Sequence, residues 1–266
     1  MSKSNNSGIK AAFASLAIPI CLLMAYLIYI FLLGNGANFE GRNSENHPIN
    51  VLGTIHKGGI AIVPILIAVL LIIVTFCIER AMTISKAKGN GQVEAFIQKV
   101  RKMLANDQLD EAIAECDRQR GSAANVIKSG LEKYKMVEND NTMDKESKIV
   151  AIQKELEEAT SLELPMLSKN LVIISTCASI ATLLGLIGTV LGMIKAFSAL
   201  AQAGAPDATA LATGISEALI NTAFGITGSA IAIIMYNYFS TKIDALTYSI
   251  DEAGFTIVQT FASKNK

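Results

Sequence analysis

Polar side chains recur in an apolar stretch near the C-terminal end of this 266-residue sequence. The stretch reads GISEALINTAFGITGSA and carries Glu217, Asn221, Thr222 and Thr227 among residues suited to a lipid bilayer. A carboxylate near the centre of a bilayer costs about 2.5–3.5 kcal/mol on insertion scales, and such a group usually faces water or a partner. Glu217 therefore indicates an ion or substrate path, whereas a position near the headgroups would favour a structural role.

Small residues recur on one face of this stretch and of the apolar stretch before it. Most successive members lie three or four residues apart, which places them on one side of a helix. The earlier set comprises Ala178, Thr182, Gly185, Thr189, Gly192 and Ala196, and the later set Gly214, Ala218, Asn221, Thr222, Gly225 and Ser229. The opposite faces carry large aliphatic side chains, which suit lipid or bulky neighbours.

Helix packing is the first explanation of these small residues. Glycine lets membrane helices approach closely, and Gly188 and Gly192 form a GxxxG pair in the earlier stretch. Threonine hydroxyls can bond to their own helix. Packing does not explain Glu217, so the functional interpretation depends on this carboxylate.

The elements that must position these residues are membrane-spanning helices. Hydrocarbon is ~30 Å thick and needs about 20 residues of helix. Four stretches meet this length, and we expect spans at residues 11–33, 59–80, 170–200 and 211–240. The fold class is therefore an all-α integral membrane protein.

The placement of lysine and arginine predicts the orientation of the spans. Residues 81–169 are rich in both, which assigns this helical segment to the cytoplasm. Residues 34–58 and the short loop 201–210 then face the periplasm, while the tail 1–10 and a C-terminal helix over 241–266 lie in the cytoplasm. Both termini are expected on the cytoplasmic side.

The first span also resembles a signal peptide, because lysines precede its apolar run. The run is too long for a typical signal core, and no convincing small-residue cleavage site follows it. We favour a retained helix that acts as an uncleaved signal anchor over a cleaved peptide.

The cytoplasmic segment reads as amphipathic helices. The run VEAFIQKVRKML places five apolar residues on one face: Val93, Phe96, Ile97, Val100 and Leu104. The zero net charge does not suggest a nucleic-acid partner, the four cysteines imply no disulfide framework, and the two histidines lack metal-ligand spacing. No cofactor or metal is expected.

Three motifs carry a resemblance to a known family. LLGLIGTVLGMIKAF, GISEALINTAFGI with AIIMYNYF, and CIERAMTISKAKG resemble the MotA/TolQ/ExbB proton channel family, and within it the ExbB branch most closely. The resemblance covers most of the chain from about Gly59 onward. The first span is then an addition to the three helices common in the family.

This resemblance implies a bacterial inner-membrane protein that is not an enzyme. Family members form a homopentameric ring around a dimer of a small single-span partner of the ExbD, TolR or MotB type. Proton flow through the ring drives motion, which a TonB-like protein transmits to outer-membrane transporters. The essential aspartate belongs to the partner's helix.

The resemblance also implies roles for individual residues. Thr189 and Thr222 match the family's two polar threonines, and Glu217 matches its acidic residue. Hydroxyls donate and accept hydrogen bonds, as a proton path requires. We expect Thr182 and Asn221 to line the same path. The expected packing residues are Gly185, Gly188, Gly192, Gly214, Ala218, Gly225 and Ser229.

Some positions depart from the family's pattern. A common proline of the last helix is Ile231 here, Asn221 replaces a smaller residue, and Lys195 stands where His or Asn is expected. These departures affect the expected shape of the outer pore mouth. They leave both threonines and the glutamate in place.

Several other functions compete with an ExbB-like role. A TolQ-like or motor-stator subunit would belong to the same family, and a non-conducting membrane scaffold would show the same packing residues. A secondary transporter would show internal repeats, which are not evident. An intramembrane hydrolase would need more than the faint nucleophile motif at Gly214 to Ser216, since both histidines lie in a loop.

Overall fold

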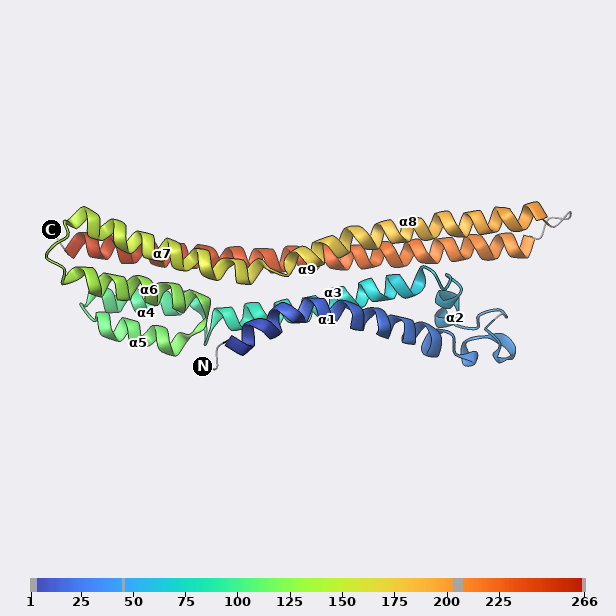
Figure 1. Cartoon of the computed structure of the whole chain (residues 1–266), viewed down its shortest axis with the longest axis horizontal. Coiled ribbons are helices and arrows are strands. Elements are labelled where there is room, and N and C mark those ends of the chain that lie inside the picture. The colour runs from blue at the N-terminus through green and yellow to red at the C-terminus, as the bar shows by residue number, and fades with distance from the viewer. Residues whose placement is uncertain (1–3, 45, 203–207, 265–266) are drawn as a thin grey trace. The chain divides into compact units, whose positions relative to one another are not determined.

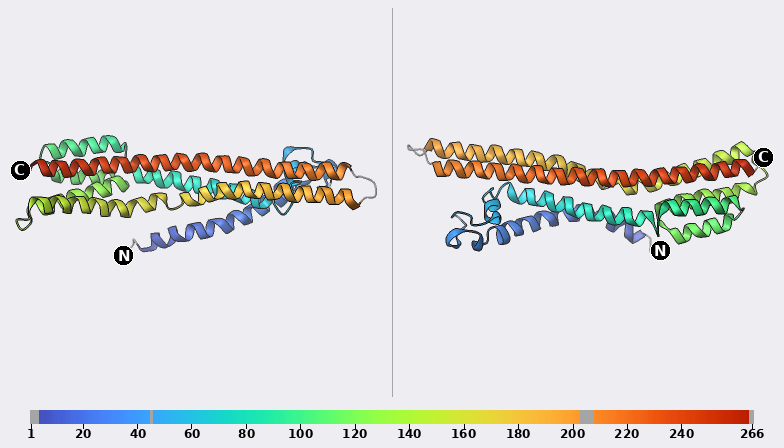
Figure 2. Two further views of the ribbon diagram at one scale, coloured as in Figure 1. Left: turned by 90° about the horizontal axis from the view of Figure 1, so that it is seen from above. Right: turned by 180° about the vertical axis from the view of Figure 1, so that it is seen from behind.

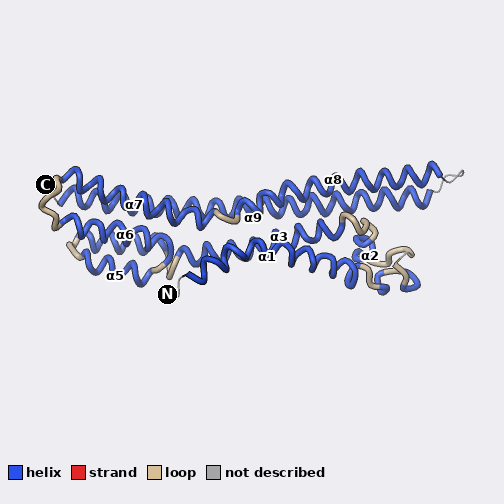
Figure 3. Tube along the Cα trace, in the orientation of Figure 1, coloured by secondary structure: helices blue, strands red, loops and turns tan. Residues whose placement is uncertain are grey.

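The structure is a computed structural model. It describes residues 4–44, 46–202 and 208–264, with side chains except at 4–14, 199–200, 202 and 210. Figure 3 shows helices joined by loops, with no strand in the part of the chain that is described. The all-α expectation is confirmed. Gly204, Pro206 and Asp207 of the expected loop 201–210 lie outside the described residues.

The elements follow one another along the chain as labelled in Figure 1. They are α1 (Ser4–Leu27), the π-helical turn η1 (Ile28–Leu33), the 3-10 turns η2 (Gly36–Asn38) and η3 (Glu40–Arg42), α2 (Val51–His56), α3 (Val63–Lys88), α4 (Val93–Ala105), α5 (Leu109–Gln119), α6 (Gly121–Glu138), α7 (Lys145–Ser168), α8 (Leu171–Gln202) and α9 (Ala208–Lys264).

Within the described residues, four helical stretches are long and apolar enough to cross a membrane. They are Ser15–Leu33, Val63–Ala105, Lys145–Ser198 and Leu211–Lys264. Each overlaps one of the expected spans, so the expectation of four helices long and apolar enough to span is confirmed, while the bounds of the spans stay predictions. The side of the membrane on which each end lies stays a prediction.

The chain divides into two compact units. The first unit comprises Met1–Cys77 and Val172–Tyr236, and the second comprises Ile78–Leu171 and Asn237–Lys266. In the first unit, α8 runs antiparallel to the first part of α9, and the two helices lie side by side in every view of Figure 1 and Figure 2. This pair carries all the expected site residues.

The segment 34–58 of the first unit is more ordered than the expected loop. The side-chain amide of Asn38 donates to the carbonyl oxygens of Leu32, at 2.8 Å, and Leu33, at 2.9 Å. Asn50 donates to the Asn38 side chain at 2.9 Å and also caps α2 by accepting from the Gly53 amide at 3.0 Å. Asn38 thus satisfies the last carbonyl groups of the first span, and Asn50 caps the short helix α2.

An aromatic cluster completes this segment. The ring of His56 stacks on Tyr29 at 4.5 Å and meets the edge of Phe39 at 5.4 Å. The Tyr29 hydroxyl donates to the His56 carbonyl oxygen at 3.2 Å. Burial lowers the pKa of His56, and the neighbouring Lys57 charge adds to this shift.

The second unit is built around a conventional apolar core. The α4 residues expected on one face are the ones that are buried, so this prediction is confirmed. Tyr134 of α6 meets Phe261 of α9 edge to face at 4.9 Å. Gly130 of α6 admits Leu156 of α7, because a Cβ there would lie 2.4 Å from a leucine methyl.

A buried arginine holds the end of α7. Arg80 is 3% exposed and donates to the carbonyl oxygen of Leu167 at 2.8 Å. Its charge is balanced by Glu79, which also accepts from the Asn170 amide at 3.1 Å. The guanidinium therefore satisfies a helix-terminal carbonyl that has no partner within its own helix.

Candidate functional site

The contact between α8 and the first part of α9 brings backbone against backbone. A Cβ added at Gly225 would lie 2.5 Å from the carbonyl oxygen of Ala181 and 2.8 Å from the Cα of Gly185. One added at Gly192 would lie 2.9 Å from the carbonyl oxygen of Gly214. We call this contact the glycine seam. Its members are Gly185, Gly188 and Gly192 of α8 and Gly214, Ala218, Asn221 and Gly225 of α9.

Thr189 and Thr222 meet across the glycine seam. Their hydroxyls are hydrogen-bonded to each other. Each hydroxyl also lies within reach of the Gly185 carbonyl oxygen, at 3.2 Å from Thr189 and 3.3 Å from Thr222. Both side chains are half-buried. The close approach of the two helices at glycine is what lets such short side chains touch.

The chemistry of this pair is that of a reversible hydrogen bond. Each hydroxyl has one proton to donate and lone pairs to accept with. Either threonine can donate to the other while its partner donates to Gly185 or to a water molecule. A pair that can reverse direction can pass a proton without ever carrying a fixed charge.

Glu217 is paired with Lys195. The lysine Nζ lies 3.0 Å from both carboxylate oxygens, so one ammonium bonds the whole carboxylate. Glu217 is 7% exposed, whereas the Lys195 side chain is 68% exposed. The costly carboxylate therefore has a counter-charge from α8, at the position where the sequence departs from the pattern that it otherwise resembles. The pair lies five to six residues from the threonines.

Asn221 faces a different neighbour from Thr222. It is 2% exposed, packs on Gly188, and donates from Nδ2 to the carbonyl oxygen of Gly58 at 2.9 Å. Its Oδ1 has no hydrogen-bond partner among the described residues. The side chain thus links α9 to the turn that precedes α3. A Cβ at Gly58 in this turn would lie 2.9 Å from the Asn221 side chain, so a larger residue does not fit there.

Thr182 and Ser229 line a recess elsewhere along the same helix pair. The recess has a volume of about 260 Å³ and is lined by Ser175, Ala178, Ser179, Thr182, Ser229, Ile233 and Tyr236. Thr182 donates to the Ala178 carbonyl oxygen at 3.4 Å. Five of the seven lining residues carry hydroxyls, so the recess offers hydrogen-bonding groups although its surface is mostly apolar.

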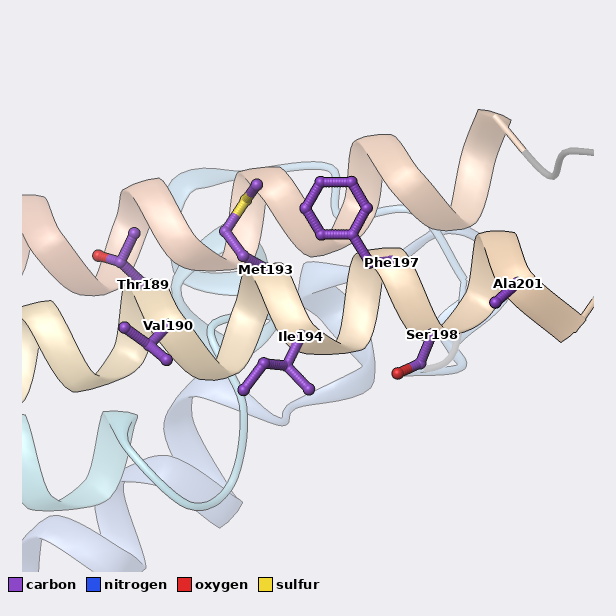
Figure 4. Close-up of a pocket in the computed structure, with 7 residues that line it drawn as sticks. All are labelled: Thr189, Val190, Met193, Ile194, Phe197, Ser198 and Ala201. Atoms are coloured by element: carbon purple, nitrogen blue, oxygen red, sulfur yellow. The ribbon is translucent and has the colours of Figure 1, made fainter.

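A second, more open groove of about 580 Å³ follows α8 beyond Thr189. Its lining residues all come from α8: Thr189, Val190, Met193, Ile194, Phe197, Ser198 and Ala201. In Figure 4, Thr189, Met193 and Phe197 project to one side of the helix, and Val190, Ile194 and Ser198 to the other. The groove is mostly apolar, with a threonine at one end.

Comparison with known proteins places these residues in a family. A model of the MotA/TolQ/ExbB proton channel family matches residues 118–252, which is half of the chain. The match contains α8, both threonines and Glu217. The chain belongs to the MotA/TolQ/ExbB proton channel family. Members are channel and motor subunits rather than enzymes, and with its apolar helices this chain is a multi-pass inner-membrane protein.

Relatives with both family names match the chain. The putative biopolymer transport protein ExbB-like 3 of Synechocystis is 37% identical over 86 residues, 32% of this chain and 41% of the relative. TolQ of Pseudomonas aeruginosa is 29% identical over 121 residues, 46% and 52% of the two chains. ExbB of Pseudomonas putida is 26% identical over 150 residues, 56% and 45%. The chain thus spans about half the length of these curated relatives.

Sequence reasoning missed several hydroxyl residues of this MotA/TolQ/ExbB chain. Ser175, Ser179 and Tyr236 line the recess with Thr182 and Ser229. The signal was present as a spacing of seven residues, since Ser175 precedes Thr182 as Thr182 precedes Thr189. Serine is common in helix contacts, so the spacing alone did not distinguish these residues from packing.

Proposed function

We propose that this chain is the ExbB-like subunit of a motor driven by the proton-motive force. Several copies, five by family resemblance, form a ring around an ExbD-like single-span partner, and protons pass through the ring. A TonB-like protein then transmits the motion to outer-membrane transport. The observation that carries the proposal is the hydroxyl pair of Thr189 and Thr222 on the glycine seam.

The groove along α8 supports the proposal that the helix of the partner lies beside α8. A helix entering the ring would bring an aspartate, which this resemblance assigns to the partner, to the level of Thr189. Apolar groove residues such as Met193 and Phe197 would contact the entering helix. The threonine hydroxyl at the end of the groove would then be the first group of this chain that a proton meets.

The large exposed side chains of the two helices support a lipid or subunit contact. On α8 they include Leu183, Ile187 and Val190, which are 58%, 48% and 58% exposed in a single chain. A soluble surface rarely shows so continuous an apolar face. We propose that lipid and neighbouring copies cover these residues, with the charged segment 81–169 and both termini in the cytoplasm.

Uptake in cells tests the role of the hydroxyls. Thr222→Val keeps the shape of the side chain and removes the hydroxyl, so potential-driven uptake should fall to the level of a deletion strain while the complex still assembles. Thr227→Val is the matched control, because this exposed hydroxyl donates to its own helix at Ala223, 2.7 Å away. Normal uptake in Thr222→Val cells would leave a non-conducting scaffold as the better account.

A TolQ-like role is the second candidate, because TolQ of Pseudomonas aeruginosa is 29% identical over 121 residues and ExbB of Pseudomonas putida 26% over 150, so the two names are not separated by these matches. Purification of the tagged chain from its native membrane, followed by mass spectrometry, separates the two. An ExbD-like and TonB-like set of co-purifying proteins supports the first role. A TolR-like partner in place of ExbD would assign the chain to the second.

A further inference from the structure

Hydroxyl side chains on α8 and α9 form three levels spaced seven residues apart. On α8 the levels are Ser175, Thr182 and Thr189, and on α9 they are Tyr236, Ser229 and Thr222. Because the helices run antiparallel, each step of seven along α8 matches a step of seven back along α9. The levels are therefore about 10 Å apart along the helix axis, at ~1.5 Å for each residue.

This spacing leaves gaps that hydroxyls cannot bridge directly. A hydrogen bond between two oxygens spans only about 2.8 Å. No charged residue occurs on α8 from 171 to 194 or on α9 from 218 to 241. Any proton that moves along this pair must therefore use hydroxyls together with water.

The recess supplies room for that water at the second and third levels. Its volume of about 260 Å³ holds several water molecules, each of which takes ~30 Å³ in the liquid. Its lining brings Ser175 and Tyr236 of the third level together with Thr182 and Ser229 of the second. Polar partners for water are thus present at both ends of the recess.

Ser229 presents its hydroxyl to the recess. The residue is 9% exposed and lines the recess, but its hydroxyl oxygen is not among the buried, unpaired oxygens of the described residues, of which Asn221 Oδ1 is the example. A polar group of this kind is normally hydrogen-bonded, to protein or to ordered water. The threonines that face elsewhere behave differently: Thr176 and Thr227 each donate to a carbonyl of their own helix at 2.7 Å.

We propose that the recess holds a chain of water molecules that carries protons between the level of Thr182 and Ser229 and the level of Tyr236. The inference rests on the proposed proton-conducting function and adds to it the half of the path nearer the cytoplasm. Ser229 positions the first water, and the Tyr236 hydroxyl is the last group of helices α8 and α9 to contact the chain of water. The proton passes as an excess charge over water and neutral hydroxyls, each of which receives one proton and releases another.

Proton flux through purified complexes tests the role of Ser229. The full chain is reconstituted with its co-purified partner in vesicles, and a potassium potential drives protons. Ser229→Val should lower the flux about fivefold or more, the factor that corresponds to one ordinary hydrogen bond. Ser229→Thr has the same shape as the valine variant but keeps a hydroxyl, so it should retain most of the flux. Equal losses in both would mean a steric effect and would overturn the proposal.

Cysteine labelling tests the water independently of conduction. Ser229→Cys in the same complexes should react with a small, charged methanethiosulfonate reagent, measured on the peptide by mass spectrometry. Thr227→Cys is the control, because it lies two residues away on the opposite side of α9. An unlabelled Ser229→Cys would show a dry recess and overturn the proposal.

The two measurements separate failure of this inference from failure of the proposed function. Labelling at Ser229→Cys with normal flux in Ser229→Val would mean that the recess is wet but off the path, which also overturns the proposal. Wild-type complexes without any flux would refute the proposed function, and the water path with it. In that case the labelling still reports whether the recess holds water.

Discussion

The glycine seam and the core of the second unit are built in opposite ways. In the second unit, large side chains point inward, and Tyr134, Leu131 and Phe261 are almost fully buried. At the seam, glycine and alanine are inside, while large residues such as Leu183 and Ile194 are more than half exposed. Burial of apolar surface stabilises a unit in water but gains little in lipid, where close backbone contact takes its place.

Polar groups differ between the two regions as well. Most ion pairs of the second unit include at least one exposed side chain, as in Lys135–Asp110, and its buried Arg80 bonds to a carboxylate and a carbonyl oxygen. The α8–α9 pair instead buries Glu217, Asn221 and Ser229. Buried polar groups in a membrane helix are costly and mark functional positions. The buried carboxylate and amide of the α8–α9 pair support the proposal that the seam carries the chemistry.

The largest effect should come from removing a large side chain from the second unit. Phe261 is fully buried against Tyr134, so Phe261→Ala should lower the free energy of unfolding by about 4 kcal/mol. Phe197 lies on α8 and is 57% exposed, so Phe197→Ala should change the free energy of unfolding little. Denaturant titration in detergent measures both, and equal losses would contradict the contrast.

A converse substitution tests the seam. Gly225→Leu forces a side chain against the Ala181 carbonyl oxygen and should destabilise α8–α9 pairing by about 3 kcal/mol. Gly254 lies on the same helix within the second unit, where a Cβ would meet Leu156 at an ordinary 3.5 Å. Gly254→Ala should therefore stabilise the chain by about 0.5 kcal/mol. Thermal unfolding in detergent compares the two, and a tolerated Gly225→Leu would refute the tight contact.

Breaking the ion pair should have a smaller effect. Lys195→Met leaves the Glu217 carboxylate without its counter-charge, although the exposed lysine limits the loss to about 1 kcal/mol. Lys195→Arg keeps the charge and serves as the control. Urea unfolding of the two variants gives the difference, and an unchanged Lys195→Met would show that solvent already screens the carboxylate.

The two units should lose stability on opposite sides of neutral pH. The pKa of His56 is held below its ordinary value of 6.5, so its contribution to stability is lost as pH falls through 6.5 and the unfolded segment binds a proton. Burial raises the pKa of Tyr134 to about 12, with Glu138 and Asp107 adding to the shift. Its contribution is lost as pH rises from about 10 to 12.

Hydrogen exchange read peptide by peptide measures both changes. Exchange of segment 34–58 should quicken below pH 6.5 after correction for the intrinsic rate, and that of α6 above pH 10. A His56→Phe variant keeps the aromatic stacking with Tyr29 and should remove the acid effect. Acid sensitivity that persists in this variant would assign the change to another group.

Much of the fold was readable from the sequence because its signals are local. The four apolar stretches and the buried face of α4 follow from composition and helical periodicity within short windows. The small faces of α8 and α9 were also evident, since Gly185, Thr189 and Gly192 recur at helical spacing.

The contacts between distant residues were not readable. The pairing of Lys195 with Glu217 depends on the register between α8 and α9, and from the sequence the lysine is only a departure from the family's pattern. The Asn221 bond to Gly58 joins residues 163 positions apart. The asparagine-rich segment 34–58 was expected as a plain loop, because turn-forming residues do not reveal which carbonyls their side chains will cap.

Voltage-driven proton flux in vesicles containing the purified complex tests the threonine path most directly. Thr189→Val should reduce the flux roughly a hundredfold, as expected when a proton-transferring group is lost. Thr176→Val removes an exposed hydroxyl of α8 that is bonded to its own helix, and should leave the flux unchanged. Wild-type flux through an intact Thr189→Val complex would contradict the central claim that protons cross at this hydroxyl pair.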